Sequence, residues 1–334
     1  VLMVVNTKAA AWNIFQRLFS NLGEEGYGLL TIERGLSEQE LKKRAQECGE
    51  NKILCVHLST LMCPAHRKDI LRWIKIWLSE KKLVCCVSTT LIEAGINVSF
   101  PIVVRSVAGI PSMIQAAGRC NRNCEKDTGY VYLWNLAEEK LGCLPEIQNG
   151  REISMKLIGS LGRTDEIGMP EMVQRYFVEE RNYTQREEKY PYKEWNSNLT
   201  AMLSKNSVCK TAAGERGDDP SRYLSKRLYQ SFRTAGTVFR VIDQETRSVL
   251  VPYGKGKELI KKLCGSHTLS EEIRYLREAQ QYSVNLYDQI FARLAKEGGL
   301  LSVGESGAVA LREEYYDEWS GIITTAREME ELIL

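Results

Sequence analysis

Residues 115–123 read Gln-Ala-Ala-Gly-Arg-Cys-Asn-Arg-Asn and place two arginines, Arg119 and Arg122, three positions apart. On a helix, residues i and i+3 share a face, so the two guanidinium groups would repel each other unless an anion lies between them. Arginine is the side chain best shaped for two-point contact with phosphate oxygens. The spacing therefore indicates a phosphate. Because a lone Arg-x-x-Arg is usually a pair of surface arginines at a helix end, the neighbouring elements must decide between the two interpretations.

A second polar stretch lies at 87–101, VSTTLIEAGINVSFP, with Ser-Thr-Thr at 88–90 directly after an apolar run. Hydroxyls and free backbone N–H groups at a strand-to-helix turn suit phosphate oxygens. Gly95 would let the backbone approach a ligand closely. The alternative is an ordinary helix N-cap, with Glu93 in the first helical turn. For this stretch taken alone, the two interpretations stay open.

Short apolar runs alternate with amphipathic patterns along the first part of the chain. The runs lie at 1–5, 29–32, 53–58, 83–87, 101–105 and 130–134, and helix patterns lie at 10–22, 37–48, 64–78 and 112–119. Continuously apolar strands that alternate with helices predict a parallel sheet covered on both faces. The fold class is therefore α/β, doubly wound, with ligands at the carboxyl ends of the strands.

The rest of the chain predicts a helical linker and a smaller α+β domain. We expect three parts, with bounds at 1–150, 151–205 and 206–334. Within the last part, TVFRVI and SVLVPYG predict one hairpin, and LLSV and AVAL at 300–311 predict another. Helix patterns lie at 256–264 and 271–297.

Composition narrows the class of protein. The chain has 334 residues, 43% hydrophobic and 26% charged, as in ordinary globular proteins. The net charge is +2, so any contact with nucleic acid must come from a local basic patch. Some of the ten cysteines lie inside apolar runs, and the paired Cys-x-x-Cys spacing of zinc sites is missing. We therefore expect no metal site, no membrane partner and a cytoplasmic location.

Two pairs of ring side chains each allow two interpretations. Trp73 and Trp77 lie four apart on one helix pattern, where core packing is more common than stacking on nucleic-acid bases. His57 and His66 lie nine apart, where a hydrogen-bonded structural role is more common than a metal pair.

Together, the two polar stretches resemble conserved motifs of superfamily 2 helicases. STTLIEAGINVSFP is similar to motif V, and QAAGRCNR is similar to motif VI, Gln-x-x-Gly-Arg-x-x-Arg. The opening VVNTKAAAWNIF resembles motif IV, and HLSTLMCPAHRKDIL at 57–71 resembles the His-x-Ser…Arg element between them. These wordings, with FRTAGTVFRVID, VLVPYGKGKELI, YSVNLY and GAVALREEYYDEWSG, are similar to the helicase–nuclease of type I CRISPR systems, nearest subtype C.

The resemblance implies that 1–150 is a second RecA-like lobe and that the last part is an accessory C-terminal domain. Arg119 and Arg122 match the motif VI arginines that reach the ATP γ-phosphate, and Arg122 is the better match to an arginine finger. Gln115 matches a glutamine that faces the nucleotide, and Gly95 matches the motif V glycine. Asn97 stands where the family usually carries an acid, so a carboxylate contact at the nucleotide is replaced by an uncharged amide.

The resemblance also implies contacts with single-stranded DNA. Ser88 and Thr89 match motif V positions on the DNA backbone, and Ser59, Asn6 and Thr7 match weaker candidates. Further implied partners are an RNA-guided surveillance complex of the Cascade type and the N-terminal half of the same protein. The implied cofactors are ATP and Mg²⁺. Their ligands come mainly from that half, because this sequence contains no phosphate loop, no Asp-Glu-x-His motor motif and no His-Asp nuclease motif.

The implied function is the C-terminal part of an ATP-dependent 3′–5′ single-stranded DNA translocase and helicase–nuclease. Such a protein degrades target DNA in type I CRISPR interference. On its own the chain is expected to be inactive and to hold no cofactor. Two alternatives stay open: a non-catalytic module that binds single-stranded DNA or a protein, and a superfamily 2 helicase of DNA repair.

Overall fold

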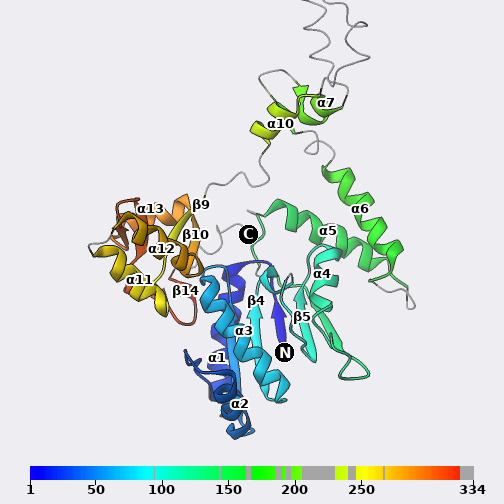
Figure 1. Ribbon diagram of the computed structural model, residues 1–334. Coiled ribbons are helices and arrows are strands. Elements are labelled where there is room, and N and C mark those ends of the chain that lie inside the picture. The colour runs from blue at the N-terminus through cyan, green and yellow to red at the C-terminus, as the bar shows by residue number, and fades with distance from the viewer. Residues whose placement is uncertain are drawn as a thin grey trace, which may run out of the picture. The chain divides into compact units, whose positions relative to one another are not determined.

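The computed structural model describes most of the chain: residues 1–93, 95–137, 139–142, 144–162, 167–184, 190–192, 197–204, 230–239, 246–265 and 268–323. The chain divides into two compact units, one of Val1–Val173 with Glu245–Leu334 and one of Gln174–Gln244 (Figure 1). The predicted boundaries near 150 and 205 stay a prediction.

A parallel sheet forms the centre of the first unit. Among the described residues it has six strands in the order β2-β3-β4-β1-β5-β6, all paired in parallel (Figure 1). The strands are β1 (Leu2–Val4), β2 (Gly28–Leu29), β3 (Lys52–Leu58), β4 (Leu83–Ser88), β5 (Ile102–Ser106) and β6 (Tyr130–Trp134). The predicted doubly wound, RecA-like fold is confirmed. Because neighbouring strands run in one direction, their carboxyl ends meet at one edge of the sheet, which we call the carboxyl edge.

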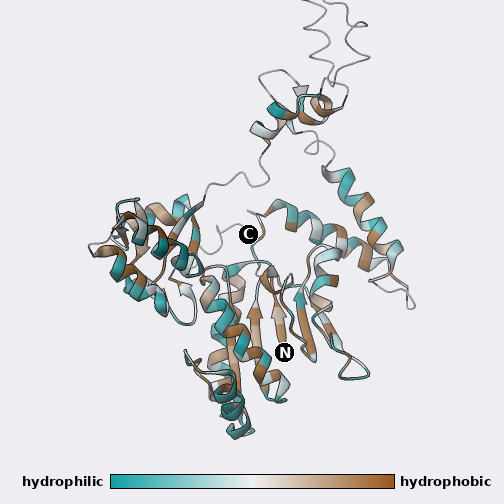
Figure 2. Ribbon diagram, in the orientation of Figure 1, coloured by the Kyte–Doolittle hydropathy of each residue, from teal (hydrophilic) through white to brown (hydrophobic). Residues whose placement is uncertain are grey.

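Helices cover both faces of this sheet. They are α1 (Lys8–Glu24), α2 (Glu38–Glu47), α3 (Pro64–Ser79) and α4 (Ile110–Ala117). In β3, Leu54 and Val56 pack in one cluster with α2 and α3, whereas Ile53 and Cys55 pack in another with α1. Both faces of the strand are therefore apolar, which is why its sequence shows no polar alternation. Figure 2 shows the strands largely in brown.

Local sequence signals set where these helices begin. Thr7 caps α1 by accepting a hydrogen bond from the backbone N–H of Ala10. Ser37 and Glu40 form a capping box at the start of α2, and Pro64 opens α3. Trp73 and Trp77 on α3 are buried and stacked with ring centroids 4.6 Å apart, so this pair belongs to the core.

The second unit holds short elements around a small apolar cluster of Leu199, Met202 and Ala235. Its described elements include β7 (Pro191–Tyr192), β8 (Ser197–Asn198), α7 (Leu199–Leu203) and α10 (Phe232–Val238). The boundary between the units, after Val173, falls within helix α6 (Pro170–Thr184). Helix α5 (Pro145–Gly159) belongs to the first unit. The first arm of the predicted TVFRVI hairpin is wrong at 237–238, because these residues end helix α10. Phe239 is the C-cap of that helix, and residues 240–242 of the arm lie outside the described residues.

The C-terminal part of the first unit is a smaller α+β fold. Its four-stranded sheet has the order β10-β9-β12-β11 among the described residues. Its elements are β9 (Thr246–Leu250), α11 (Lys255–Cys264), α12 (Leu269–Ala279), β10 (Ser283–Tyr287), α13 (Asp288–Lys296), β11 (Leu300–Val303) and β12 (Ala308–Leu311). The predicted hairpin at 300–311 is confirmed as the antiparallel pair of β11 and β12.

A single helix over 271–297 was the wrong prediction, because strand β10 interrupts it. Within β10, Val284 and Leu286 are buried while Asn285 between them is exposed. This alternation has the period of a strand, and the amphipathic helices on either side, α12 and α13, hid it.

Two short strands, β13 (Tyr316–Asp317) and β14 (Gly321–Ile322), dock this C-terminal part on the loop after β3. The backbone N–H of Ile322 donates to the carbonyl of Leu61 at 3.0 Å. Gly321 has φ +81°, and a Cβ there would lie 2.4 Å from that carbonyl oxygen. Glycine is therefore required for this approach.

The two histidines lie buried at this junction. His66 Nδ1 is 2.9 Å from the Tyr316 hydroxyl, and its ring stacks on Tyr253 with centroids 4.2 Å apart. His57 Nδ1 is 3.4 Å from the carbonyl of Trp319. Both have structural partners, and no group of three metal-ligating side chains was found among the described residues.

Acidification is expected to destabilise this junction. Burial lowers the pKa of His57 to about 4, although the bond to Trp319 opposes it; burial and then the charge of Arg34 lower the pKa of His66 to about 3. In the unfolded chain both would titrate near 6.5, so below that pH the unfolded state binds more protons. The stability they contribute is complete above about pH 6.5 and is lost progressively toward pH 4.

Urea unfolding at pH 7 and pH 5 measures this effect. The wild type should lose on the order of 2–4 kcal/mol more than a His57→Gln/His66→Asn variant, because carboxylates titrate alike in both. An equal loss in the two proteins would contradict the expectation.

The cysteines that the structure describes are free thiols, and Cys55, Cys85 and Cys86 are buried in the sheet. Within the same residues, no helix combines the length and apolar character that crossing a membrane requires.

Candidate functional site

The five side chains predicted to contact DNA lie at the carboxyl edge. Asn6 and Thr7 follow β1, Ser59 follows β3, Ser88 ends β4 and Thr89 follows it. Since β3, β4 and β1 are neighbours, the structure brings the five residues together. Thr7 is 5% exposed and the other four are fully buried. Among the described atoms, the buried hydroxyl of Thr89 has no hydrogen-bond partner. Their contact with DNA stays a prediction.

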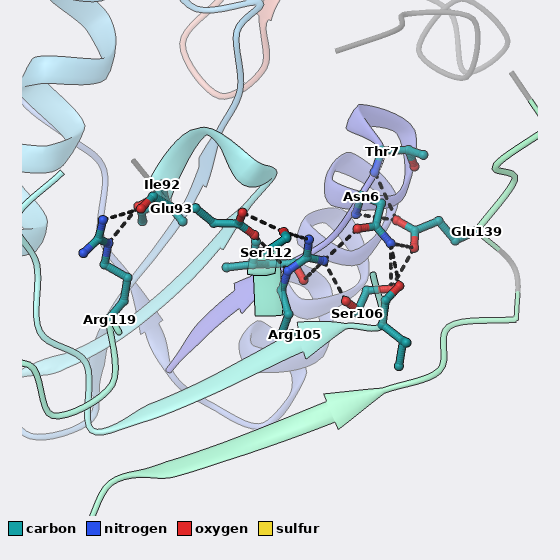
Figure 3. A network of polar contacts seen from close by, with 11 residues as sticks. Asn6, Thr7, Ile92, Glu93, Arg105, Ser106, Ser112, Arg119 and Glu139 are labelled. Carbon is teal, nitrogen blue, oxygen red and sulfur yellow. Dashed lines mark hydrogen bonds and ion pairs between the residues drawn. The ribbon is translucent and has the colours of Figure 1, made fainter. Parts of the chain in front are cut away.

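Glu139, which sequence reasoning missed, holds the end of β1 (Figure 3). One carboxylate oxygen accepts the backbone N–H groups of Asn6 at 2.6 Å and Thr7 at 3.0 Å. The other accepts the Asn6 side-chain amide at 2.7 Å and the Ser106 hydroxyl at 2.7 Å. These N–H groups belong to the N-cap of α1 and the residue before it, so the carboxylate lies at the positive end of the helix dipole, which stabilises it. In the sequence, Glu139 was only one of two acids after an apolar run.

Arg105 continues this network toward the middle of the lobe (Figure 3). It is 1% exposed and donates to the Asn6 side-chain oxygen at 2.8 Å and to the Ser112 hydroxyl at 2.8 Å. Its Nε lies 2.9 Å from Glu93 Oε1, as an ion pair without hydrogen-bond geometry. Ser112 donates to the other Glu93 oxygen at 2.7 Å. Burial raises the pKa of Glu93, and the charge of Arg105 opposes that shift.

Arg119 lies at the far end of the network (Figure 3). It is 8% exposed, and it donates to the carbonyls of Ile92, at 3.0 Å, and Glu93. These carbonyls end the 3-10 helix η1 (Thr90–Ile92), so the guanidinium fixes the segment that resembles motif V. Burial lowers the pKa of Arg119, and the positive charge of Arg122 lowers it further.

The two motif VI arginines do not share a helical face, and this part of the prediction is wrong. Helix α4 ends at Ala117, with Gly118 as its C-cap. Arg119 and Arg122 lie in the turns that follow. There Asn121 has φ +46°, and its side chain closes the turn by bonding both backbone groups of Lys126.

The residues predicted to face the nucleotide are exposed. They are Arg122, Gln115, Gly95 and Asn97. Arg122 forms no hydrogen bond or ion pair with the residues that the structure describes. The guanidinium of Arg122 is exposed and unpaired, so it is free to bind a ligand. The guanidinium of Arg119 is buried and already bonded to backbone carbonyls of the folded lobe. Their predicted nucleotide roles stay predictions.

A basic groove, which sequence reasoning also missed, runs along α3. Its cavity is about 630 Å³, and its cationic lining is Arg67, Lys68, Arg72 and Lys75. The apolar floor includes Leu58, Leu71, Ile76, Leu91 and Ile96, and Gly95 lines it as well. Lys68, Arg72 and Lys75 are four and three positions apart, which places them on one face of the helix. The lining carboxylate Glu38 already pairs with Lys42 at 3.1 Å.

The groove suits an anionic ligand with flat apolar groups. Arg67 is half-buried, and its Nε has no hydrogen-bond partner among the described atoms. Burial lowers the pKa of Arg67. The signal for the groove in the sequence was the run His-Arg-Lys-Asp-Ile-Leu-Arg-Trp-Ile-Lys, whose cations recur at helical spacing.

Part of the chain is similar in sequence to known proteins. Residues 1–125 match the family model described as CRISPR-associated nuclease/helicase Cas3, C-terminal. A Cas3 nuclease/helicase of Haloferax volcanii is 46% identical over 54 residues, which are 16% of this chain and 6% of that protein.

Solved structures agree in fold. The crystal structure of T. fusca Cas3-AMPPNP matches 97% of this chain and 38% of its own, with 13% identity and a TM-score of 0.53. For T. fusca Cas3-ADP the shares are 97% and 39%, with 14% identity and a TM-score of 0.52. The chain thus spans less than two fifths of these solved chains. The subtype stays a prediction. Residues 1–125 are similar to the Cas3 C-terminal family, and the chain as a whole has the fold of the matching parts of the solved Cas3 structures.

Proposed function

We propose that this chain supplies the second motor lobe of an ATP-dependent 3′–5′ single-stranded DNA translocase within a CRISPR-associated helicase–nuclease. The observation that carries the proposal is the exposed, unpaired Arg122 beside the buried Arg119, within the segment that matches the Cas3 C-terminal family model. A free guanidinium held on a fixed turn can reach a phosphate on a facing lobe. The names of two solved relatives contain AMPPNP and ADP, which supports a nucleotide there.

ATP and Mg²⁺ would be held mainly by a phosphate-loop lobe, whose motif this sequence does not contain. In this chain Arg122, Gln115, Gly95 and Asn97 would meet the nucleotide, and Arg119 would hold the motif V segment in place. The bound metal would neutralise charge on the transferring phosphoryl group. The chain alone is expected to hydrolyse no ATP. Mixing it with a separately made phosphate-loop half and single-stranded DNA should produce turnover.

Single-stranded DNA is proposed as the polymer that the lobe moves along. The basic groove adds support, because four cations line it over an apolar floor. Phosphates pair with such cations, and bases pack on apolar surface. The RNA-guided surveillance complex is the proposed protein partner, and the proposed location is the cytoplasm. The C-terminal part would cap the DNA path or dock that complex.

The groove gives a salt-dependent prediction. Replacing Lys68, Arg72 and Lys75 together by alanine should weaken single-stranded DNA binding alike for all sequences. Three lost phosphate contacts should flatten the plot of log K against log salt by about 2, since each contact contributes about 0.7 to the slope on single strands.

Fluorescence anisotropy at several salt concentrations measures this slope. The matched control is alanine at Lys261, Arg277 and Lys296, which are exposed cations of the C-terminal part. If the groove variant keeps the wild-type slope, or if the control flattens it equally, the groove is not on the DNA path.

The binding-module alternative has one observation in its favour, because the groove's cations need no nucleotide or second lobe to bind a strand. Salt-sensitive binding that Arg122→Ala leaves unchanged, with no turnover in the mixed halves, would favour that alternative. A repair helicase would instead turn over ATP without any response to a surveillance complex.

A further inference from the structure

We propose that Glu139, Arg105 and Glu93 are positioning residues that couple the strand edge at Asn6 to the arginine Arg119. We call these three residues, together with Asn6, Ser112 and Arg119 that they bind, the polar relay. The inference rests on the proposed function, in which Asn6 lies near DNA and Arg119 lies behind the nucleotide site. The family match and the motif resemblance assign no role to Glu139 or Arg105.

At one end of the relay, Glu139 binds the loop between β1 and α1. Glu139 receives four hydrogen bonds of 3.0 Å or less from the end of β1 and from Ser106. Two of them come from backbone N–H groups, at Asn6 and Thr7, so any movement of this loop changes the surroundings of the carboxylate directly. Glu139 is itself 5% exposed, which leaves water little room to replace a lost bond.

The middle of the relay is shared between side chains. Asn6 bonds Glu139 through its amide nitrogen and Arg105 through its amide oxygen. Both groups of one amide are therefore committed, and the Asn6 side chain cannot turn over without breaking two charged contacts. Ser112 likewise bridges Arg105 and Glu93.

The other end of the relay reaches Arg119. Glu93 meets Arg105 with its carboxylate and Arg119 with its backbone carbonyl. A displacement of Arg105 would therefore shift Glu93, whose backbone carbonyl orients Arg119. Arg119 in turn lies next to the exposed Arg122, whose charge acts on its pKa.

The charges and the burial of the relay residues favour their moving together. The signs alternate from Glu139 to Arg105 to Glu93 to Arg119, and each residue is less than a tenth exposed. Arg105 and Glu93 form an ion pair, and separating them would leave two buried charges without a partner, which is costly in a low-dielectric interior. Its members are distant in sequence, since 133 positions separate Asn6 and Glu139. The relay thus links segments that the backbone alone does not link.

The test measures coupling rather than activity. In the protein that includes its phosphate-loop lobe, the affinity for labelled single-stranded DNA is measured with and without saturating non-hydrolysable ATP analogue. The ratio of the two affinities is the coupling factor, and linkage requires the same factor when DNA is added to the analogue titration. Glu139→Gln keeps the shape of the side chain and removes its charge. It should weaken the coupling, so that the factor differs from one by at least about fivefold less than in the wild type. Ser112→Ala, which removes only the bridging hydroxyl, should act in the same direction.

The matched control is Glu272→Gln, a buried glutamate that accepts the backbone N–H of Ser306 at 2.9 Å in the C-terminal part. It should leave the coupling factor unchanged. An unchanged factor in both relay variants, or an equal change in Glu272→Gln, would overturn the inference. Where Glu139→Gln lowers the yield of folded protein, Ser112→Ala decides alone.

A separate measurement distinguishes failure of the proposed function from failure of the relay. ATP turnover of the wild-type sample with single-stranded DNA tests that function. A wild type that turns over ATP but has a coupling factor of one overturns the relay and leaves the proposed function standing. A wild type with neither property overturns both.

Discussion

Arg122→Ala is expected to lower DNA-stimulated ATP turnover by about 10³-fold or more, with the phosphate-loop lobe present. The guanidinium is exposed and has no ion-pair partner among the described residues. Its loss should therefore remove stabilisation of charge during phosphoryl transfer without removing any contact of the folded lobe. The melting temperature should consequently stay within about a degree of the wild type, because surface substitutions cost little.

Two control variants separate a finger from a general charge effect. Arg122→Lys keeps the charge but loses the planar fork, and it should recover only a small part of the turnover. Arg277→Ala removes an exposed arginine of α12 and should leave turnover unchanged. Turnover of Arg122→Ala within tenfold of the wild type would mean that Arg122 is not a finger, and the binding-module alternative would gain.

The main sheet was predictable because its strands are buried on both faces. Runs such as ILCVHL and LVCCV are almost entirely apolar and too short for a helix, so between helix patterns they fit a buried parallel strand best. The C-terminal part was harder, because α12, β10 and α13 follow one another so closely that one long helix fits the overall pattern. Only the alternation around Asn285 reveals the strand, and five residues are too few to outweigh their flanks.

The site was predictable by position but not by contact. Motif resemblance located Arg119 and Arg122, yet their spacing gave no hint that Gly118 ends the helix and that only Arg122 stays exposed. Glu139 was beyond reach for a different reason. Its partners lie at least 33 positions away, and nothing local distinguishes this acid from an exposed one. Contacts of that range depend on how the strands are ordered in the sheet.

Arg105→Ala is expected to lower the free energy of unfolding of the lobe by about 3–5 kcal/mol, the range found when one partner of a buried ion pair is removed. Glu93 would be left buried without its counter-charge, and the Asn6 oxygen and Ser112 hydroxyl would each lose a donor. Urea unfolding followed by tryptophan fluorescence measures the loss, since Trp73 and Trp77 are buried in the same lobe.

The sign of the pH effect identifies the cause. Burial already raises the pKa of Glu93, and removing Arg105 takes away the largest of the effects that oppose this shift. In the variant, Glu93 should therefore take up a proton on folding, so the deficit relative to wild type should shrink as the pH falls from 7 toward 5. A deficit that is constant over this range would point to lost packing instead.

A double variant separates the two roles of Arg105, in stability and in coupling. Arg105→Met combined with Glu93→Leu removes both charges and keeps apolar volume, so it should regain most of the stability that Arg105→Ala loses. It should not regain coupling between DNA and nucleotide, because methionine and leucine offer Asn6 and Ser112 no hydrogen bond. Recovery of stability without recovery of coupling would separate the two roles of the pair. Recovery of both would show that the lobe needs only a filled interior, and the positioning role of Arg105 would be refuted.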